Sequence, residues 1–179
     1  ALTATGGNIT TAKMTIAGTG IAGIAGGGSL RLSGGSLTDP NRIDGGQIVG
    51  VGTLAANAGT ALVGHGSINN PIDFDGTSEL RAQGGALVLS GAMQDVGVLG
   101  TADATGTLNV VNTWNSNVAN MVELLGGSLV GGPLVNGGKV VGHGTLGPKV
   151  LTNDGLLAAQ GGELLVTQST PTGLDLDGP

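Results

Sequence analysis

Two histidines are the first residues of this chain whose type and setting could do chemistry. His65 and His143 each stand in the tripeptide Gly-His-Gly, where an imidazole could take part in catalysis as a general acid or base. A valine, Val51, stands at the corresponding place in the related phrase Gly50 to Leu54. A position that accepts valine belongs to a turn or a strand. We therefore predict a structural role for both histidines.

The same tripeptide also occurs at the active site of polygalacturonases, which are right-handed β-helices. That resemblance implies a carbohydrate-cleaving site. The family also needs carboxylates from Asn-Thr-Asp and Asp-Asp motifs, and neither motif occurs in this sequence. The sequence therefore predicts no catalytic residue.

Two Asp-x-Asp-Gly segments could offer oxygen ligands to a cation. They are DFDG, with Asp73, Asp75 and Gly76, and DLDG, with Asp175, Asp177 and Gly178. Alternate residues of a strand share one face, so each segment places two carboxylates beside a turn, as calcium sites often do. The long calcium loop and the Gly-Gly-x-Gly-x-Asp repeat of calcium β-rolls are both absent. We expect solvated turns and no metal or cofactor, and leave calcium as the alternative.

Two further groups of side chains are open to more than one interpretation. Trp114 lies in the Asn-rich segment NTWNSN. An exposed indole beside amides could stack on a sugar ring, but we favour a loop tryptophan folded over the body of the protein. Asp39, Arg42 and Asp44 could pair across a corner, where exposed ion pairs contribute little stability.

Composition excludes several classes of function. The chain has no cysteine, so it has neither disulfides nor thiolate metal sites. Six basic residues against twelve acidic ones give a net charge of -6, which leaves no basic stripe for nucleic acid. We find no Ser-His-Asp order, Walker loop, dinucleotide fingerprint or membrane-spanning run. These absences predict a protein that is not an enzyme.

Internal repeats point to the elements that must position these residues. Gly34 to Leu54 and Gly126 to Leu146 match without a gap, and Gly64 to Gly91 aligns with Gly142 to Ser169 after a one-residue slip. The phrase Gly-Gly-x-Leu-x-Leu/Val recurs at positions 27, 84 and 161. Such a unit cannot bury its apolar face alone, so stacked copies must share one core.

The repeated unit reads as strand and turn. In Glu79 to Gln83, Leu80 and Ala82 fall on one face and Arg81 falls on the other, which is the two-residue period of a half-buried strand. The chain has 38 glycines, and at that density a helix would lose roughly 1 kcal/mol per glycine. Glycine pairs instead allow the chain to turn corners.

These features predict an all-β fold, a parallel β-helix or β-solenoid of roughly nine coils of about 19 residues. Residues 1–179 would form a single solenoid domain, as a segment of a longer chain or a fibre subunit. Insertions are expected at Asp39 to Arg42 and at Asn112 to Asn120. Ser, Thr and Asn at the corners could stack as polar ladders.

The phrases GGSLVGG, NGGKVVGHGTL and NDGLLAAQGGELLV resemble the glycine-rich repeats of bacterial surface and secreted proteins, including autotransporter passengers and filamentous-haemagglutinin-like adhesins. This resemblance implies a parallel β-solenoid, export to the cell surface or beyond, and a structural or adhesive role. It supplies no functional residues.

The leading hypothesis is therefore a non-enzymatic extracellular stalk, spacer or filament. We expect it to self-associate end to end or to stack on flanking solenoid segments. A carbohydrate-binding or carbohydrate-cleaving β-helix of the phage tailspike or pectinase type is the alternative, with surface glycans as its partner.

Overall fold

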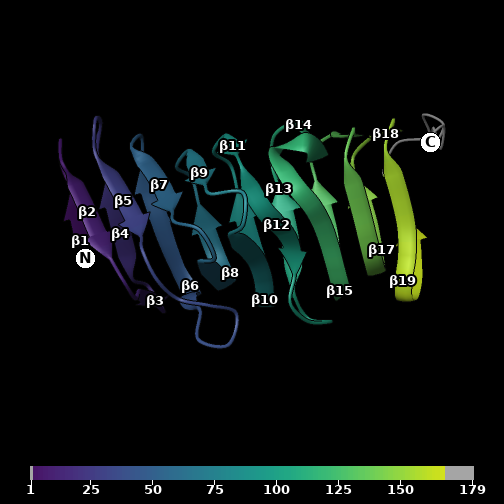
Figure 1. The fold of residues 1–179 in the computed structure, drawn as a ribbon, viewed down its shortest axis with the longest axis horizontal. Helices are drawn as coiled ribbons and strands as arrows, with labels where there is room; N and C mark the ends of the chain where they lie inside the picture. The colour runs from purple at the N-terminus through teal and green to yellow at the C-terminus, as the bar shows by residue number, and fades with distance from the viewer. Residues whose placement is uncertain (1, 168–179) are drawn as a thin grey trace.

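The computed structural model of the chain describes residues 2–167 and shows a parallel β-solenoid (Figure 1). The coils stack along the longest axis from the purple N-terminal end to the yellow C-terminal end, and the strands run across that axis. Every pairing between the strands named below is parallel. The prediction of a parallel β-helix is confirmed.

Three sheets make up the solenoid. An eleven-stranded sheet contains β1 (Leu2–Ala4), β3 (Thr15–Ala17), β4 (Ile21–Ile24), β6 (Asn41–Gly50), β8 (Ala61–Ile68), β10 (Glu79–Leu89), β12 (Val96–Thr101), β13 (Thr107–Val110), β15 (Ala119–Gly131), β17 (Lys139–Pro148) and β19 (Leu156–Val166). A five-stranded sheet contains β2 (Asn8–Thr11), β5 (Ser29–Leu32), β7 (Thr53–Ala56), β9 (Ile72–Phe74) and β11 (Met93–Gln94). A three-stranded sheet contains β14 (Trp114–Asn115), β16 (Leu134–Asn136) and β18 (Leu151–Asn153).

Each coil has three sides, and the large sheet supplies two of them. Its long strands bend at a register irregularity, as between Ala82 and Leu87 of β10. The half of such a strand before the bend forms the third side of one coil, and the half after the bend forms the first side of the next coil. The two smaller sheets form the second side. The described residues contain one short 3-10 helix, η1 (Ser116–Val118), and no other helix. They therefore include no helix that is long and apolar enough to cross a membrane.

The turns number about eight, slightly fewer than the sequence predicted. The difference arises because the coils vary in length and most are longer than expected. Leu87 pairs with Leu108 across a coil of ordinary length. The longest coil runs from Ile16 to Ile43, and the shortest from Ser128 to Thr145.

The expected insertions are found close to their predicted places. The longest coil carries a loop at residues 33–40, and Asn41 and Arg42 already belong to β6. In the Asn-rich segment, the path from Val110 to Ala119 is longer than the path from Leu89 to Val96 on which it stacks. The helix η1 occupies this extra length.

Stacked aliphatic side chains form the core. Leu62, Leu80, Leu99, Val122 and Val140 lie one above another in successive coils and are at most 1% exposed. Each inward residue therefore buries its side chain against the same position of the coils before and after it, as expected of stacked repeats.

Buried amides and hydroxyls stack in the same way at one corner. The Ser116 hydroxyl donates to Oδ1 of Asn136 at 2.6 Å, and Nδ2 of Asn136 donates to Oδ1 of Asn153 at 2.6 Å. All three residues are at most 2% exposed. Pairing each polar group with its neighbour removes the cost of burying it, and it confirms that polar residues stack in ladders at corners.

The sequence repeats do not all match structurally equivalent residues. Gly50 to Gly52 links β6 to β7 at the corner between the first and second sides, whereas Gly142 to Gly144 lies within β17 at the bend between the third and first sides. Likewise, Leu54 lies in the five-stranded sheet and Leu146 in the large one. The two copies of the ungapped repeat therefore occupy different sides of the solenoid. They are similar in sequence because every side needs inward leucines and every corner needs glycines.

Candidate functional sites

The two histidines occupy equivalent places in the fold. His65 lies in β8 against Gly84 and Gly85, and His143 lies in β17 against Gly161 and Gly162 of the next coil. A Cβ atom added at Gly85 would lie 3.2 Å from Cβ of His65. The glycine pair that bends the next coil thus also leaves room for an imidazole.

Val51 does not correspond to these histidines. It is 75% exposed at the corner between β6 and β7, whereas both histidines are half-buried within strands. The sequence comparison that linked the three positions was therefore wrong. Within the described residues, the contact recorded for a histidine ring nitrogen is between Nδ1 of His143 and the carbonyl oxygen of Gln160, at 3.3 Å.

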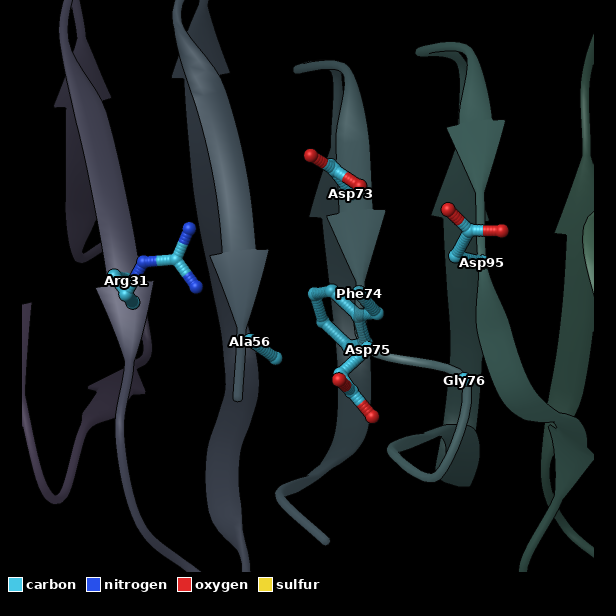
Figure 2. A pocket seen from close by; sticks show the side chains of 7 residues that line it. All are labelled: Arg31, Ala56, Asp73, Phe74, Asp75, Gly76 and Asp95. Atoms are coloured by element: carbon cyan, nitrogen blue, oxygen red, sulfur yellow. The ribbon is translucent and has the colours of Figure 1, made fainter. Parts of the chain in front are cut away.

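A shallow cavity of about 310 Å³ opens on the second side of the solenoid (Figure 2). Figure 2 shows Arg31 on one side of it and the carboxylates of Asp73, Asp75 and Asp95 on the other. Ala56, on the intervening strand β7, also lines it.

The side chains around this cavity are engaged locally. Nη1 of Arg31 donates to Oδ1 of Asn57 at 2.9 Å, and no ion pair to the three carboxylates is recorded among the described residues. Oδ1 of Asp75 accepts hydrogen bonds from the backbone N–H and the hydroxyl of Thr77, at 3.2 and 3.0 Å. Asp75 therefore stabilises a turn, as expected for an aspartate that ends a strand.

No group of three or more His, Asp or Glu side chains within residues 2–167 has the geometry to hold a metal ion. The three carboxylates of this cavity are therefore spread along the surface and do not converge. The second Asp-x-Asp-Gly segment, with Asp175, Asp177 and Gly178, lies outside the described residues.

Trp114 lies inside the solenoid instead of in a loop over it. It begins β14, pairs with Leu134, and is 7% exposed. A second cavity, of about 350 Å³, lies beside it. Its lining comes from two successive coils: Gly91, Ala92, Met93, Val110, Asn112, Thr113, Trp114, Asn115 and Val118.

The proposed pairing among Asp39, Arg42 and Asp44 does not occur. Asp39 instead forms an ion pair with Lys13 of the first coil, because the 33–40 loop folds back toward it. Nη1 of Arg42 donates to Oε1 of Gln83 at 3.2 Å, across the intervening strand β8.

A buried ion-pair cluster was not expected from the sequence. Arg81 was predicted to lie on an exposed face, yet it is 5% exposed. Its Nε contacts Oε2 of Glu79 at 2.5 Å, and its Nη2 contacts Oε2 of Glu123 at 2.6 Å. Leu80 and Ala82 point inward as predicted. The cluster depends on Glu123, 42 residues away, which no local pattern could reveal.

Comparison with protein-family models, with curated proteins and with solved structures finds no match to this chain. The fold described above therefore carries the functional argument.

Proposed function

We propose that the protein is a non-enzymatic structural β-solenoid that serves outside the cell as a stalk, spacer or filament. The observation that carries this proposal is the mostly aliphatic core, in which one inward column runs without interruption from Leu62 to Leu157 through every coil between them. One eleven-stranded sheet extends over the same length. A core that repeats coil after coil stabilises a long, regular body. Such a body would serve by holding whatever is attached to its two ends at a fixed distance.

Self-association or stacking on further solenoid segments is part of this proposal. A parallel ladder presents backbone N–H and C=O groups at its edges, and these pair readily with another strand of the same kind. A second copy of the chain, or a neighbouring solenoid segment, offers both the matching backbone groups and the matching inward side chains.

Export is proposed from the resemblance of the Gly-Gly-x-Leu phrases to surface-protein repeats. The lack of cysteine and the small number of charged residues suit an extracellular rod with few exposed cleavage sites. A carbohydrate-cleaving role has less support, since the three carboxylates of the second side face an arginine and Asp75 is engaged in a turn.

Electron microscopy of the purified chain tests the structural role. We expect filaments or end-to-end rods with a repeat of about 4.8 Å along the axis, the spacing of paired strands. Light scattering over a range of concentrations should show growing particle mass. Short rods of constant monomeric mass at every concentration would contradict the proposal of self-association.

A further inference from the structure

The cavity beside Trp114 lies where the second side of the solenoid is interrupted. Parallel pairing runs from β2 to β11 and again from β14 to β18, but β11 and β14 do not pair. The other two sides continue through the same two coils, since β10 pairs with β13 and β12 with β15. The interruption is therefore local.

A tryptophan stands in an aliphatic column at this interruption. Leu30, Leu54, Ile72 and Met93 stack in successive coils on this side, and the column resumes with Leu134. Leu89 pairs with Val110, and Met93 and Trp114 lie equally far beyond them, so Trp114 takes the place opposite Met93. The indole is much larger than a leucine side chain, and Trp114 pairs in register with Leu134 of the next coil but not with Met93 of the coil before it.

A buried polar atom of the cavity lining, Nε1 of Trp114, has no hydrogen-bond partner. The other such side-chain atom found in residues 2–167 is Oδ1 of Asn70, which is not a lining residue and whose Nδ2 donates to the Gly52 carbonyl oxygen at 2.8 Å. Unpaired buried groups of this kind are rare and call for a structural or functional reason.

The ligand must match an apolar wall with a few polar groups. Met93, Val110, Trp114 and Val118 supply the apolar surface, and Asn112, Thr113 and Asn115 supply amides and a hydroxyl. The volume of about 350 Å³ falls within the range of small-molecule pockets. The continuous pairing on the other two sides holds the coils one strand apart, which leaves no room for an inserted peptide strand.

We propose that this cavity binds a single sugar ring. A sugar presents C–H faces to the indole and the aliphatic side chains, and its hydroxyls both donate and accept hydrogen bonds. The site is independent of the structural role, because a stalk or filament can carry it on its surface.

Trp114 itself reports on the site, since the chain has one Trp and no Tyr. Its fluorescence should change saturably when the protein is titrated with glucose, galactose, mannose or N-acetylglucosamine, one of them at lower concentration than the rest. Calorimetry with that sugar should give the same dissociation constant. No response to any of the four sugars, as expected if only water enters the cavity, would overturn the proposal.

Two variants separate the site from the fold. Trp114→Leu restores the aliphatic column, so we expect an unchanged circular dichroism spectrum and no heat of sugar binding. Trp114→Phe keeps an aromatic face without the N–H donor and should bind about ten-fold more weakly, because it loses one hydrogen bond.

Asp73→Asn, in the other cavity, is the control and should bind as the natural chain does. Sugar binding by Trp114→Leu at the natural affinity, or binding of cyclohexanol but of no sugar, would overturn the proposal.

Discussion

At the scale of single residues, Arg81 shows how the outer face of a strand can become buried. Its guanidinium contacts Glu79 and Glu123 and donates to the Thr101 carbonyl oxygen at 3.2 Å. The two glutamates are on β10 and β15, with β12 between them, so the arginine ties three coils together.

We expect Arg81→Ala to lower the free energy of unfolding by about 2 kcal/mol, because it leaves two partly buried carboxylates without their cation. Urea denaturation measures this loss. Arg42→Ala, which removes one hydrogen bond to Gln83, is the matched control and should cost about 0.5 kcal/mol. Equal effects of the two substitutions would show that the cluster adds nothing.

Asp103 is the residue whose titration should affect stability. Its slight burial raises the pKa, but hydrogen bonds from the Thr105 hydroxyl and from the backbone N–H groups of Gly84, Thr105 and Gly106 outweigh this, so the pKa is lowered. A lowered pKa means that the ionised carboxylate stabilises the fold. This contribution is present above the unfolded value near 4 and is lost as the pH falls through the lower folded value.

The variant Asp103→Asn tests this effect. At pH 7 it should be less stable than the natural chain by about 1 kcal/mol, a modest figure for an exposed turn. In urea titrations at decreasing pH, the difference should shrink below about pH 4. Ser90→Ala is the control, because it removes a hydrogen bond to Asn69 that involves no titratable group, and its effect on stability should not depend on pH. A difference that stays constant down to pH 2 would contradict the assignment.

At the scale of elements, the close approach of β12 to β15 depends on Gly100. A Cβ atom at this position would lie 1.8 Å from the backbone oxygen of Glu123. We expect Gly100→Ala to push the two strands apart and to lower the free energy of unfolding by about 3 kcal/mol or more, as severe backbone clashes do. Thermal or urea denaturation provides the measurement.

Gly7 provides the control for this substitution. A Cβ atom there would meet nothing within 4 Å, and the backbone is not in the left-handed region. Gly7→Ala should therefore be neutral or slightly stabilising, by up to about 1 kcal/mol. If both alanine variants were equally stable, the strands would have to tolerate more separation than the pairing implies.

Much of the strand structure could be predicted because it depends on local pattern. Alternation in Glu79 to Gln83 correctly places Leu80 and Ala82 inside. The number and length of the coils were predicted less accurately from the spacing of the Gly-Gly-x-Leu phrases, because the phrases at Gly27 and Gly84 lie on different sides of the solenoid. The spacing between these two phrases is therefore not a whole number of coils.

The candidate sites were less predictable, because they depend on which residues the stacking brings together. Trp114 and Met93 are opposed only because the coil between them has a particular length. Likewise, Arg31 and Asp73 line one hollow together with Ala56 of the intervening strand β7. Sequence alone can indicate that such residues are unusual, but the register decides what they face.

At the scale of the whole molecule, about eight coils repeat the same arrangement of strands and corners, with small irregularities. The longest irregularity is the inserted loop 33–40, which the ion pair between Lys13 and Asp39 holds against the first coil. A smaller one, the break beside Trp114, affects only one side. Most of the body is thus regular, and the cavity for which we propose a ligand lies at one of its irregularities.

The stacking direction also determines how the rod responds to tension. The strands run across the long axis, so the hydrogen bonds between coils point along it (Figure 1). A force applied along the axis therefore loads one ladder of bonds at a time instead of shearing many together. We expect the outermost coil to detach first, and a coil of about 20 residues to release roughly 70 Å of chain. Under load, the molecule should therefore lengthen coil by coil, in steps of similar size.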